Sequence, residues 1–110
     1  MIEYKDFQKV EIRVGTIIDA KENNLLKNPS IVMKIDFGNE IGIKKSSAQL
    51  QGNYQSINLI NKQIAAVINF HPKQIGKVIS EVLVLGFPDK HNQPILISPD
   101  LKVVNGVRLF

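Results

Sequence analysis

The stretch NKQIAAVINFHPKQIGKVISEVLVL, residues 61–85, decides the fold class, because it places two apolar runs on either side of one basic turn. The runs Ile64–Phe70 and Val82–Leu85 have the length of strands, and they predict two buried strands. The connection His71–Lys77 contains a proline, a glycine and two lysines, which predicts a constrained, positively charged loop. Loops held by a rigid scaffold are frequent positions for binding residues. The stretch therefore indicates binding as the function.

Composition narrows the class of protein. At 110 residues with 44% apolar content, residues 1–110 are expected to form one domain around a single core. The chain has no cysteine, so disulfides and thiolate metal sites are excluded and a reducing compartment is expected. The first ten residues mix charged and apolar side chains unlike a signal peptide, and no apolar run approaches the roughly 20 residues that span a bilayer. We expect a cytoplasmic protein without membrane insertion.

The charge balance is moderately basic. Lys and Arg number 14 against 10 Asp and Glu, giving a net charge of +4, and only Arg13 and Arg108 are arginine. A basic excess fits a polyanionic partner, although it also serves solubility. Lysine acts as a point charge, whereas bidentate reading of bases usually uses arginine. If nucleic acid is the partner, phosphates and shape should dominate over sequence.

The first half of the chain predicts a long strand and a hairpin. Val10–Lys21 alternates with Ile12, Val14, Ile18 and Ala20 on one face, and Gly15 suggests a bulge. Residues 31–37 alternate cleanly, with Ile31, Met33, Ile35 and Phe37 facing the core.

A two-residue turn at Gly38–Asn39 is predicted to lead into a return strand, Glu40–Lys44, with Ile41 and Ile43 on the core face. Lys45 should end that strand, and Ser46 or Ser47 should cap a helical turn over residues 48–51.

The remaining segments are short. Residues 54–60 suggest a helical or irregular piece, Ile95–Ser98 a last strand, and Asn105–Gly106 a turn in the tail. Many short strands with frequent turns are typical of a small barrel. We predict an all-β fold, a five-stranded OB-fold barrel with short helical connections and extra terminal strands.

Three runs resemble a known family. These are DFGNEIGIKKSSAQL (residues 36–50), INKQIAAVINFHP (60–72) and SEVLVLG (80–86), together with the opening strand EIRVGTI (11–17). They resemble the CsaA-type export-related chaperones, which belong to the wider group of OB-fold tRNA-binding domains, free or appended to aminoacyl-tRNA synthetases. The likeness covers nearly the whole chain. One departure is Val82–Leu83, where synthetase-linked relatives typically have Gly-Met after the Ser-Glu pair.

The resemblance implies a homodimer, tRNA binding on the side of the barrel, and affinity for unfolded or pre-export polypeptides. Two functions therefore stay open, an export-related chaperone and a structure-specific tRNA-binding module that acts free or with a synthetase. Neither needs a cofactor.

Candidate RNA contacts are the lysines on strand ends and on the basic turn, with two neighbouring serines. Ammonium groups would neutralise phosphates, and hydroxyls would bind phosphate or ribose. Ordinary solvated lysines and a capping serine are the alternative. The candidates are Lys44, Lys45, Ser46, Ser47, Lys62, Lys73 and Lys77.

Three further sets have other expected roles. Polar residues within apolar strands, Asn69, Ser80 and Glu81, are predicted to bind the loop backbone and hold the basic turn. Candidate peptide contacts, each with core packing as its alternative, are Phe37, Phe70, Ile75 and Phe87. An apolar finish and an aromatic start suggest a dimer contact made by Tyr4, Phe7, Val107, Leu109 and Phe110.

No constellation for catalysis is visible in the sequence. His71 and His91 lie in different loops without cysteine or clustered carboxylates, so neither a metal site nor an oriented base is predicted. We expect no enzymatic activity. With five Phe, two Tyr and no Trp, base stacking is not expected to be the main source of RNA affinity.

Overall fold

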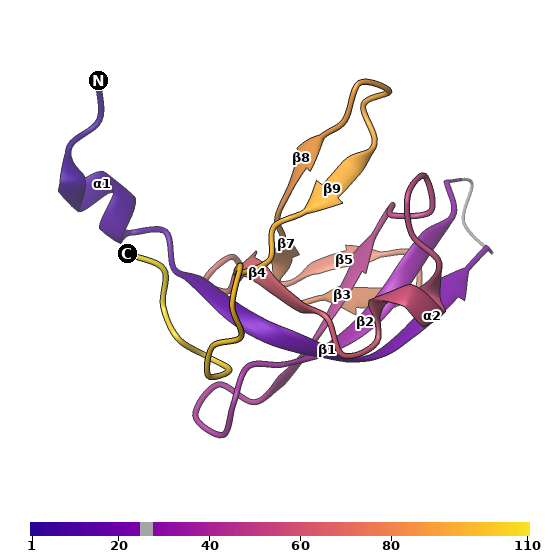
Figure 1. Ribbon diagram of the computed structural model, residues 1–110, viewed down its shortest axis with the longest axis horizontal. Helices are drawn as coiled ribbons and strands as arrows, with labels where there is room; N and C mark the ends of the chain where they lie inside the picture. Colours follow the sequence, from indigo (N-terminus) through magenta and orange to yellow (C-terminus); the bar gives the residue numbers. More distant parts are fainter. Residues whose placement is uncertain (25–27) are drawn as a thin grey trace.

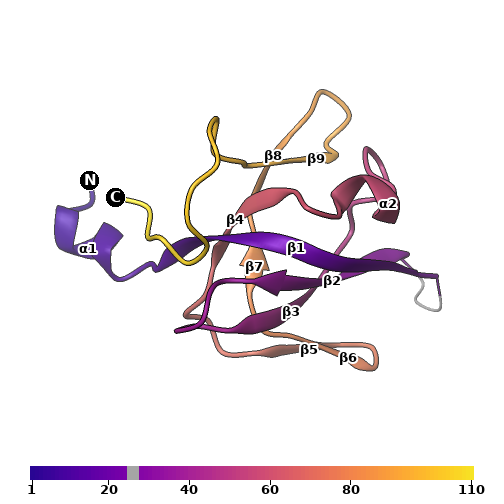
Figure 2. The same ribbon diagram turned by 60° about the horizontal axis from the view of Figure 1, so that its bottom comes forward.

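A five-stranded antiparallel sheet forms the body of the computed structural model, which describes residues 1–24 and 28–110. In spatial order its strands are β3 (Ile43–Ala48), β2 (Ser30–Asp36), β1 (Ile12–Asn23), β4 (Gln63–Val67) and β7 (Leu83–Val84). The sheet curls into a half-barrel (Figures 1 and 2). This arrangement confirms the prediction of an OB-like all-β fold.

The core lies on the concave side of this sheet. Ile31, Met33, Ile35 and Phe37 are all at most 1% exposed, as their alternation predicts. Residues contributed by the other strands and by the connections complete the core: Ile17, Leu50, Leu59, Ile64, Ala66 and Val82. The apolar face of β2 is thus the centre around which the other strands close.

The long first strand carries its bulge at Ile18, not at Gly15. The pairing of β1 with β2 shifts register between Ile17 and Asp19, so Ile17 is buried and Ile18 is 42% exposed. The predicted inward position of Ile18 is therefore wrong, because the extra residue reverses the alternation. Gly15 instead allows close packing, since a Cβ there would lie 2.6 Å from Cγ2 of Ile35.

The β2–β3 connection is wider than the predicted two-residue turn. Asp36 pairs with Ile43, which leaves residues 37–42 between the strands, and both Gly38 and Gly42 have positive φ. Ile43 is 56% exposed, so its predicted core position is wrong. Strand β3 also continues to Ala48, through the positions at which we predicted a strand end and a helix cap.

The predicted basic turn is a small hairpin. Its strands are β5 (Lys73–Ile75) and β6 (Val78–Ser80), and it packs along β3 (Figure 2). A second hairpin, β8 (Gly86–Pro88) with β9 (Pro94–Leu96), projects from the body (Figure 1). The predicted buried strand after the turn is reduced to β7, and Leu83 within it is 50% exposed.

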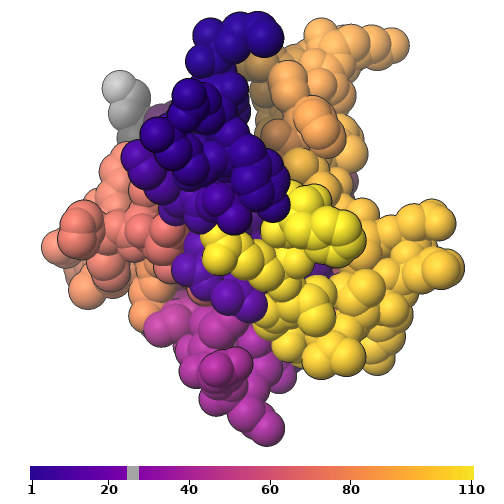
Figure 3. All heavy atoms as spheres, turned by 90° about the vertical axis from the view of Figure 1, so that its left-hand side faces the viewer, coloured from indigo at the N-terminus to yellow at the C-terminus, as the bar shows by residue number. Residues whose placement is uncertain are grey.

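The two ends of the chain lie side by side (Figures 1 and 3). Helix α1 (Tyr4–Gln8) begins with a capping box, and α2 (Ser56–Leu59) connects β3 to β4. The tail turns at Asn105–Gly106 as predicted and then joins the start of β1, where the amide of Leu109 donates to the carbonyl of Ile12 at 2.9 Å. No helix in residues 1–24 or 28–110 is long and apolar enough to cross a membrane.

Candidate functional site

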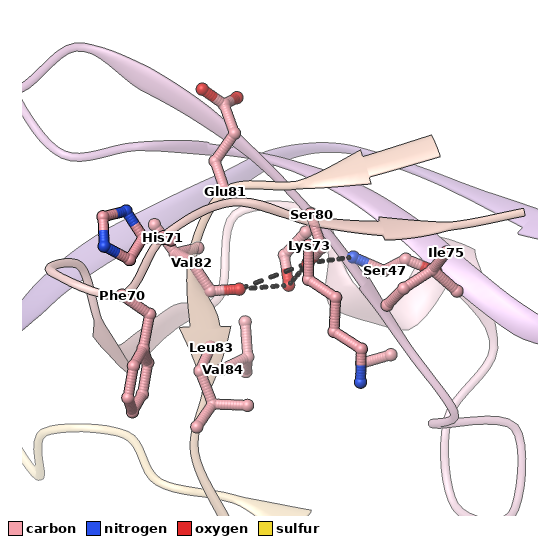
Figure 4. A pocket seen from close by; sticks show the side chains of 12 residues that line it. Ser47, Phe70, His71, Lys73, Ile75, Ser80, Glu81, Val82, Leu83 and Val84 are labelled. Carbon is pink, nitrogen blue, oxygen red and sulfur yellow. Dashed lines mark hydrogen bonds between the residues drawn. The ribbon is translucent and has the colours of Figure 1, made fainter. Parts of the chain in front are cut away.

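A groove of about 440 Å³ opens between β3, the β5–β6 hairpin and β7 (Figure 4). We call it the β3–β7 groove. Its lining comes from four segments that are far apart in the sequence or separated by turns: residues 46–48, residues 70–71, Lys73 with Ile75, and residues 80–84. The basic turn identified in the sequence therefore forms one wall of a concave site.

Three serines, Ser46, Ser47 and Ser80, line the groove. The Ser47 amide donates to Oγ of Ser80 at 3.1 Å, and the Ser46 hydroxyl donates to the carbonyl of Val82 at 3.2 Å. The Ser47 hydroxyl donates to Oγ of Ser30 at 3.1 Å, and Ser46 and Ser47 are only 1% and 9% exposed. This burial argues against the predicted contact of these two hydroxyls with phosphate or ribose. Their hydroxyls instead bond buried polar groups of Val82 and of Ser30 on β2.

Glu81 closes the free edge of β3. Its amide donates to the carbonyl of Lys45 at 2.7 Å, and its Oε1 accepts the amide of Lys45 at 3.0 Å. Its Oε2 lies 4.0 Å from Nζ of Lys44. Together with Ser80, Glu81 replaces the strand that would otherwise pair with this edge. The side-chain bonds of Ser80 and Glu81 go to β3 and to Val82 and not to residues 71–77, so their predicted role of holding the basic turn stays a prediction.

Asn69 organises a different part of the molecule. Its Oδ1 accepts the amide of Glu11 at 3.0 Å, and its Nδ2 donates to the carbonyl of Lys9 at 2.7 Å. These bonds attach the end of β4 to the entrance of β1. The prediction that Asn69 holds the basic turn is therefore wrong.

The predicted lysines divide into two groups. Lys73 lines the groove, Lys44 lies beside Glu81, and Lys45 is exposed on the neighbouring strand position. Lys77 is exposed at the tip of the β5–β6 hairpin. Lys62 is separate, because it borders another hollow of about 420 Å³ with Thr16, Asn61 and Lys102.

Lys34 is a further exposed lysine next to β3, although the sequence did not single it out. Lys34 and Lys45 are directly opposite each other on β2 and β3, and both are exposed. Like charges in such a cross-strand pair destabilise a sheet. The alternation along β2 predicts that Lys34 points outward. Its pairing with Lys45 was not predicted, because the two-residue turn expected at Gly38–Asn39 would have set a different register.

The four candidate peptide contacts do not form one surface. Phe37 is 1% exposed and belongs to the core, so its predicted exposure at a binding site is wrong. Phe70 is 58% exposed and lies in the groove with the half-buried Ile75. Phe87 is 67% exposed but belongs to the projecting hairpin, opposite Ile95. Leu83, which the sequence did not mark as a contact, is half exposed and lines the groove.

The predicted dimer residues gather at the chain ends. Tyr4, Phe7, Leu109 and Phe110 surround one hollow of about 200 Å³, and the rings of Tyr4 and Phe7 are 6.3 Å apart. Val107 lies earlier in the tail and borders a different hollow. We call these four residues the terminal cluster. Figure 3 shows the N-terminal segment and the tail next to each other on this face.

Three ionisable side chains, His71, Lys73 and Glu81, are among the residues that line the groove. No group of three or more His, Cys, Asp or Glu side chains suited to a metal ion occurs in the described part of the chain. The pKa of Asp89 is lowered by hydrogen bonds from the Asn53 side chain and the amides of Gln93 and His91. Asp89 thereby orders the turn of the β8–β9 hairpin, away from the groove.

Comparison with known proteins identifies the family. The family model described as a putative tRNA binding domain matches residues 12–108. The structure is similar to that of the chaperone CsaA from Picrophilus torridus, with 45% identity, a TM-score of 0.91 and coverage of 100% of both chains. It is also similar to the chaperone CsaA from Bacillus anthracis, with 39% identity, a TM-score of 0.93, and coverage of 100% of this chain and 99% of that one.

A third similarity is to part of a much longer enzyme. The methionine–tRNA ligase of Pyrococcus horikoshii is 32% identical over 108 residues, which is 98% of this chain and 14% of the ligase. This chain therefore spans about 14% of the length of that ligase. The matched family and the shared half-barrel confirm the resemblance stated from the sequence. The chain belongs to the family of putative tRNA-binding domains, and its fold is that of the CsaA structures.

Proposed function

We propose that this protein binds tRNA by the side of the half-barrel that carries the β3–β7 groove, and that it does so without catalysis. One observation carries the proposal: Lys44, Lys45, Lys73 and Lys77, chosen from the sequence, lie on β3 and on the hairpin packed against it. Family membership supports tRNA as the ligand. The lysines would contact phosphates, and the curvature of the surface would select a folded RNA.

The basic pair Lys34–Lys45 favours an anionic ligand. Two exposed ammonium groups opposite each other on neighbouring strands repel, and a phosphate between them would remove that repulsion. Lysine supplies charge without the planar fork of arginine, so the contact recognises backbone and shape. We propose accordingly that binding is strongly salt-dependent and only weakly dependent on RNA sequence.

The test is fluorescence anisotropy of labelled tRNA at about 50 mM and about 200 mM salt. Wild-type affinity should fall by about a hundredfold or more across this range if several phosphates are contacted. The variant Lys44→Ala/Lys45→Ala/Lys73→Ala should bind far more weakly at the lower salt concentration and show a shallower salt dependence. Binding is measured on samples with matching circular dichroism spectra.

A variant of equal charge provides the control. Lys5→Ala/Lys21→Ala/Lys90→Ala removes three exposed lysines outside the groove and should retain affinity close to the wild type. Equal losses of tRNA affinity in both triple variants would mean that net charge alone determines binding, and they would reject the proposed surface. Weak, salt-insensitive binding by the wild type would reject tRNA binding itself.

We propose an export-related chaperone role as the second candidate function. Phe70, Ile75 and Leu83 give the groove an apolar wall suited to side chains of an unfolded or pre-export polypeptide, and the two CsaA structures compared above are those of chaperones. Such a protein would act in the cytoplasm as a homodimer. Suppression of the aggregation of a chemically unfolded client, lost on Phe70→Ser, would support this role.

Under the first candidate function, in contrast, the protein would act as a tRNA-binding module, either free or together with an aminoacyl-tRNA synthetase.

A further inference from the structure

We propose that the β3–β7 groove holds one unpaired nucleotide of the bound RNA, with its base against Phe70 and Leu83 and its phosphate on Lys73. The inference rests on the proposed tRNA-binding function and specifies what enters the groove. It also changes the expectation from composition, because a single exposed aromatic ring in a concave site is sufficient to stack one base.

The groove has the size and surface for a flat apolar ligand. Its volume of about 440 Å³ falls within the usual range of small-molecule sites, roughly 300–1,000 Å³. Phe70 and Leu83 are 58% and 50% exposed at its wall, and Val82 is buried beside them. The serine groups of the lining are already bonded to one another or to the backbone of Val82. Such a surface contacts the face of a base and reads little of its edge.

Charge separates a nucleotide from an apolar peptide side chain. Lys73 lines the groove, and within residues 1–24 and 28–110 no carboxylate forms an ion pair with it. The Glu81 carboxylate accepts the Lys45 amide, and Figure 4 shows it pointing away from the Lys73 amine. A peptide side chain filling the groove would leave the Lys73 ammonium without a counter-ion at its rim, whereas a nucleotide brings its own phosphate.

Among the positions of a folded RNA, an unpaired nucleotide fits this arrangement and a paired one does not. In an RNA duplex both faces of a base are covered by its stacked neighbours, so neither face is open to Phe70. A base extruded from a loop or at a strand end offers one face for stacking and keeps its phosphate within reach of a lysine. The occupant is therefore a single-stranded position of a folded RNA.

The natural absence of tryptophan allows a direct test. In the variant Phe70→Trp the new indole is the sole tryptophan, so its fluorescence reports on the groove alone. Titration with tRNA should quench this fluorescence, with the same midpoint as the anisotropy of labelled tRNA. The control Ile57→Trp places an indole on α2 at a residue that is 74% exposed, and its fluorescence should not change.

Two further variants separate stacking from charge. Phe70→Leu should weaken tRNA binding by about 5- to 150-fold, the range found for one stacked base, without changing the salt dependence. Lys73→Gln should reduce the slope of log affinity against log salt by about one, which corresponds to one lost phosphate contact. Both effects are measured by anisotropy, so they do not depend on the tryptophan variant.

The outcomes distinguish this inference from the function on which it rests. Anisotropy binding without quenching of Phe70→Trp, or with wild-type affinity in Phe70→Leu, would overturn the nucleotide site and leave tRNA binding intact. Absence of any anisotropy change with wild-type protein would overturn both. If reduced, carboxymethylated ribonuclease A, which contains no tryptophan, binds the Phe70→Trp variant in the groove and tRNA does not displace it, the groove is a peptide site and the inference fails. Labelling the ribonuclease with an acceptor of indole fluorescence makes energy transfer from the groove the readout for this arm.

Discussion

At the residue scale, Glu81 shows how a charged side chain can be structural in a basic site. A carboxylate would repel phosphate if it were free, but Glu81 is held by the backbone of Lys45 and lies near Lys44. It thereby closes a strand edge that would otherwise present an unpaired amide. The Ser80–Glu81 pair thus forms part of the groove's wall while its hydrogen bonds hold β3.

Replacing Glu81 should separate hydrogen bonding from charge. Glu81→Gln retains an oxygen for the Lys45 amide and should change the free energy of unfolding by less than about 1 kcal/mol, because exposed ion pairs contribute little. Glu81→Ala removes the acceptor and should cost about 1 kcal/mol or more. Urea denaturation of the two variants measures the difference. Equal losses would mean that the charge, and not the hydrogen bond, closes the edge.

At the scale of elements, the sequence predicted those strands whose faces are uniform. β2 has large apolar residues at every second position, so one choice of register buries all of them. The same pattern gave a wrong result for β1, because the extra residue at Ile18 interchanges the buried and exposed faces of the strand. The end of β3 was also mispredicted. Ser46 and Ser47 are buried in the strand because they have polar partners on other segments, which a sequence pattern cannot reveal.

The bulge in β1 makes a sharp prediction about two neighbouring isoleucines. Ile17 is fully buried, so Ile17→Ala should lower the free energy of unfolding by about 2–5 kcal/mol. Ile18 is 42% exposed, so Ile18→Ala should cost less than about 1 kcal/mol. Thermal or urea unfolding of the two single variants gives the comparison. A larger loss of unfolding free energy for Ile18→Ala than for Ile17→Ala would contradict the bulge and support the uninterrupted alternation expected from the sequence.

The candidate site was predicted in part for a related reason. Lysines on strand ends and on a rigid turn are visible in the sequence, and Lys44, Lys45, Lys73 and Lys77 do lie on β3 or the adjoining hairpin. Lys62 was included because it begins the same strand unit, but it borders a separate hollow. The groove itself arises where residues 46–48, 70–75 and 80–84 meet, and that meeting is a property of the sheet's curl, which no local pattern specifies.

At the scale of the whole molecule, the terminal cluster departs from an ordinary surface. Tyr4 is 67% exposed and Phe110 is fully exposed, while the backbone of the tail is joined to β1 by the bonds of Val107 and Leu109. Exposed aromatic residues on an ordered backbone are typical of an interaction surface. We infer that this surface contacts a second copy of the chain, as the proposed homodimer requires.

Replacing side chains without deleting the tail tests this dimer most cleanly, because the backbone of residues 107–110 helps to hold β1. Tyr4→Lys/Phe110→Lys exchanges two exposed side chains, so the protomer should stay folded while the added charges of both copies oppose each other across a two-fold interface. Light scattering after gel filtration should give twice the protomer mass for the wild type and the protomer mass for the variant. The control Ile57→Lys alters a similarly exposed apolar residue on α2 and should remain dimeric. If the double variant is still a dimer, the interface lies elsewhere on the protein. If the wild type is a monomer, the homodimer is rejected.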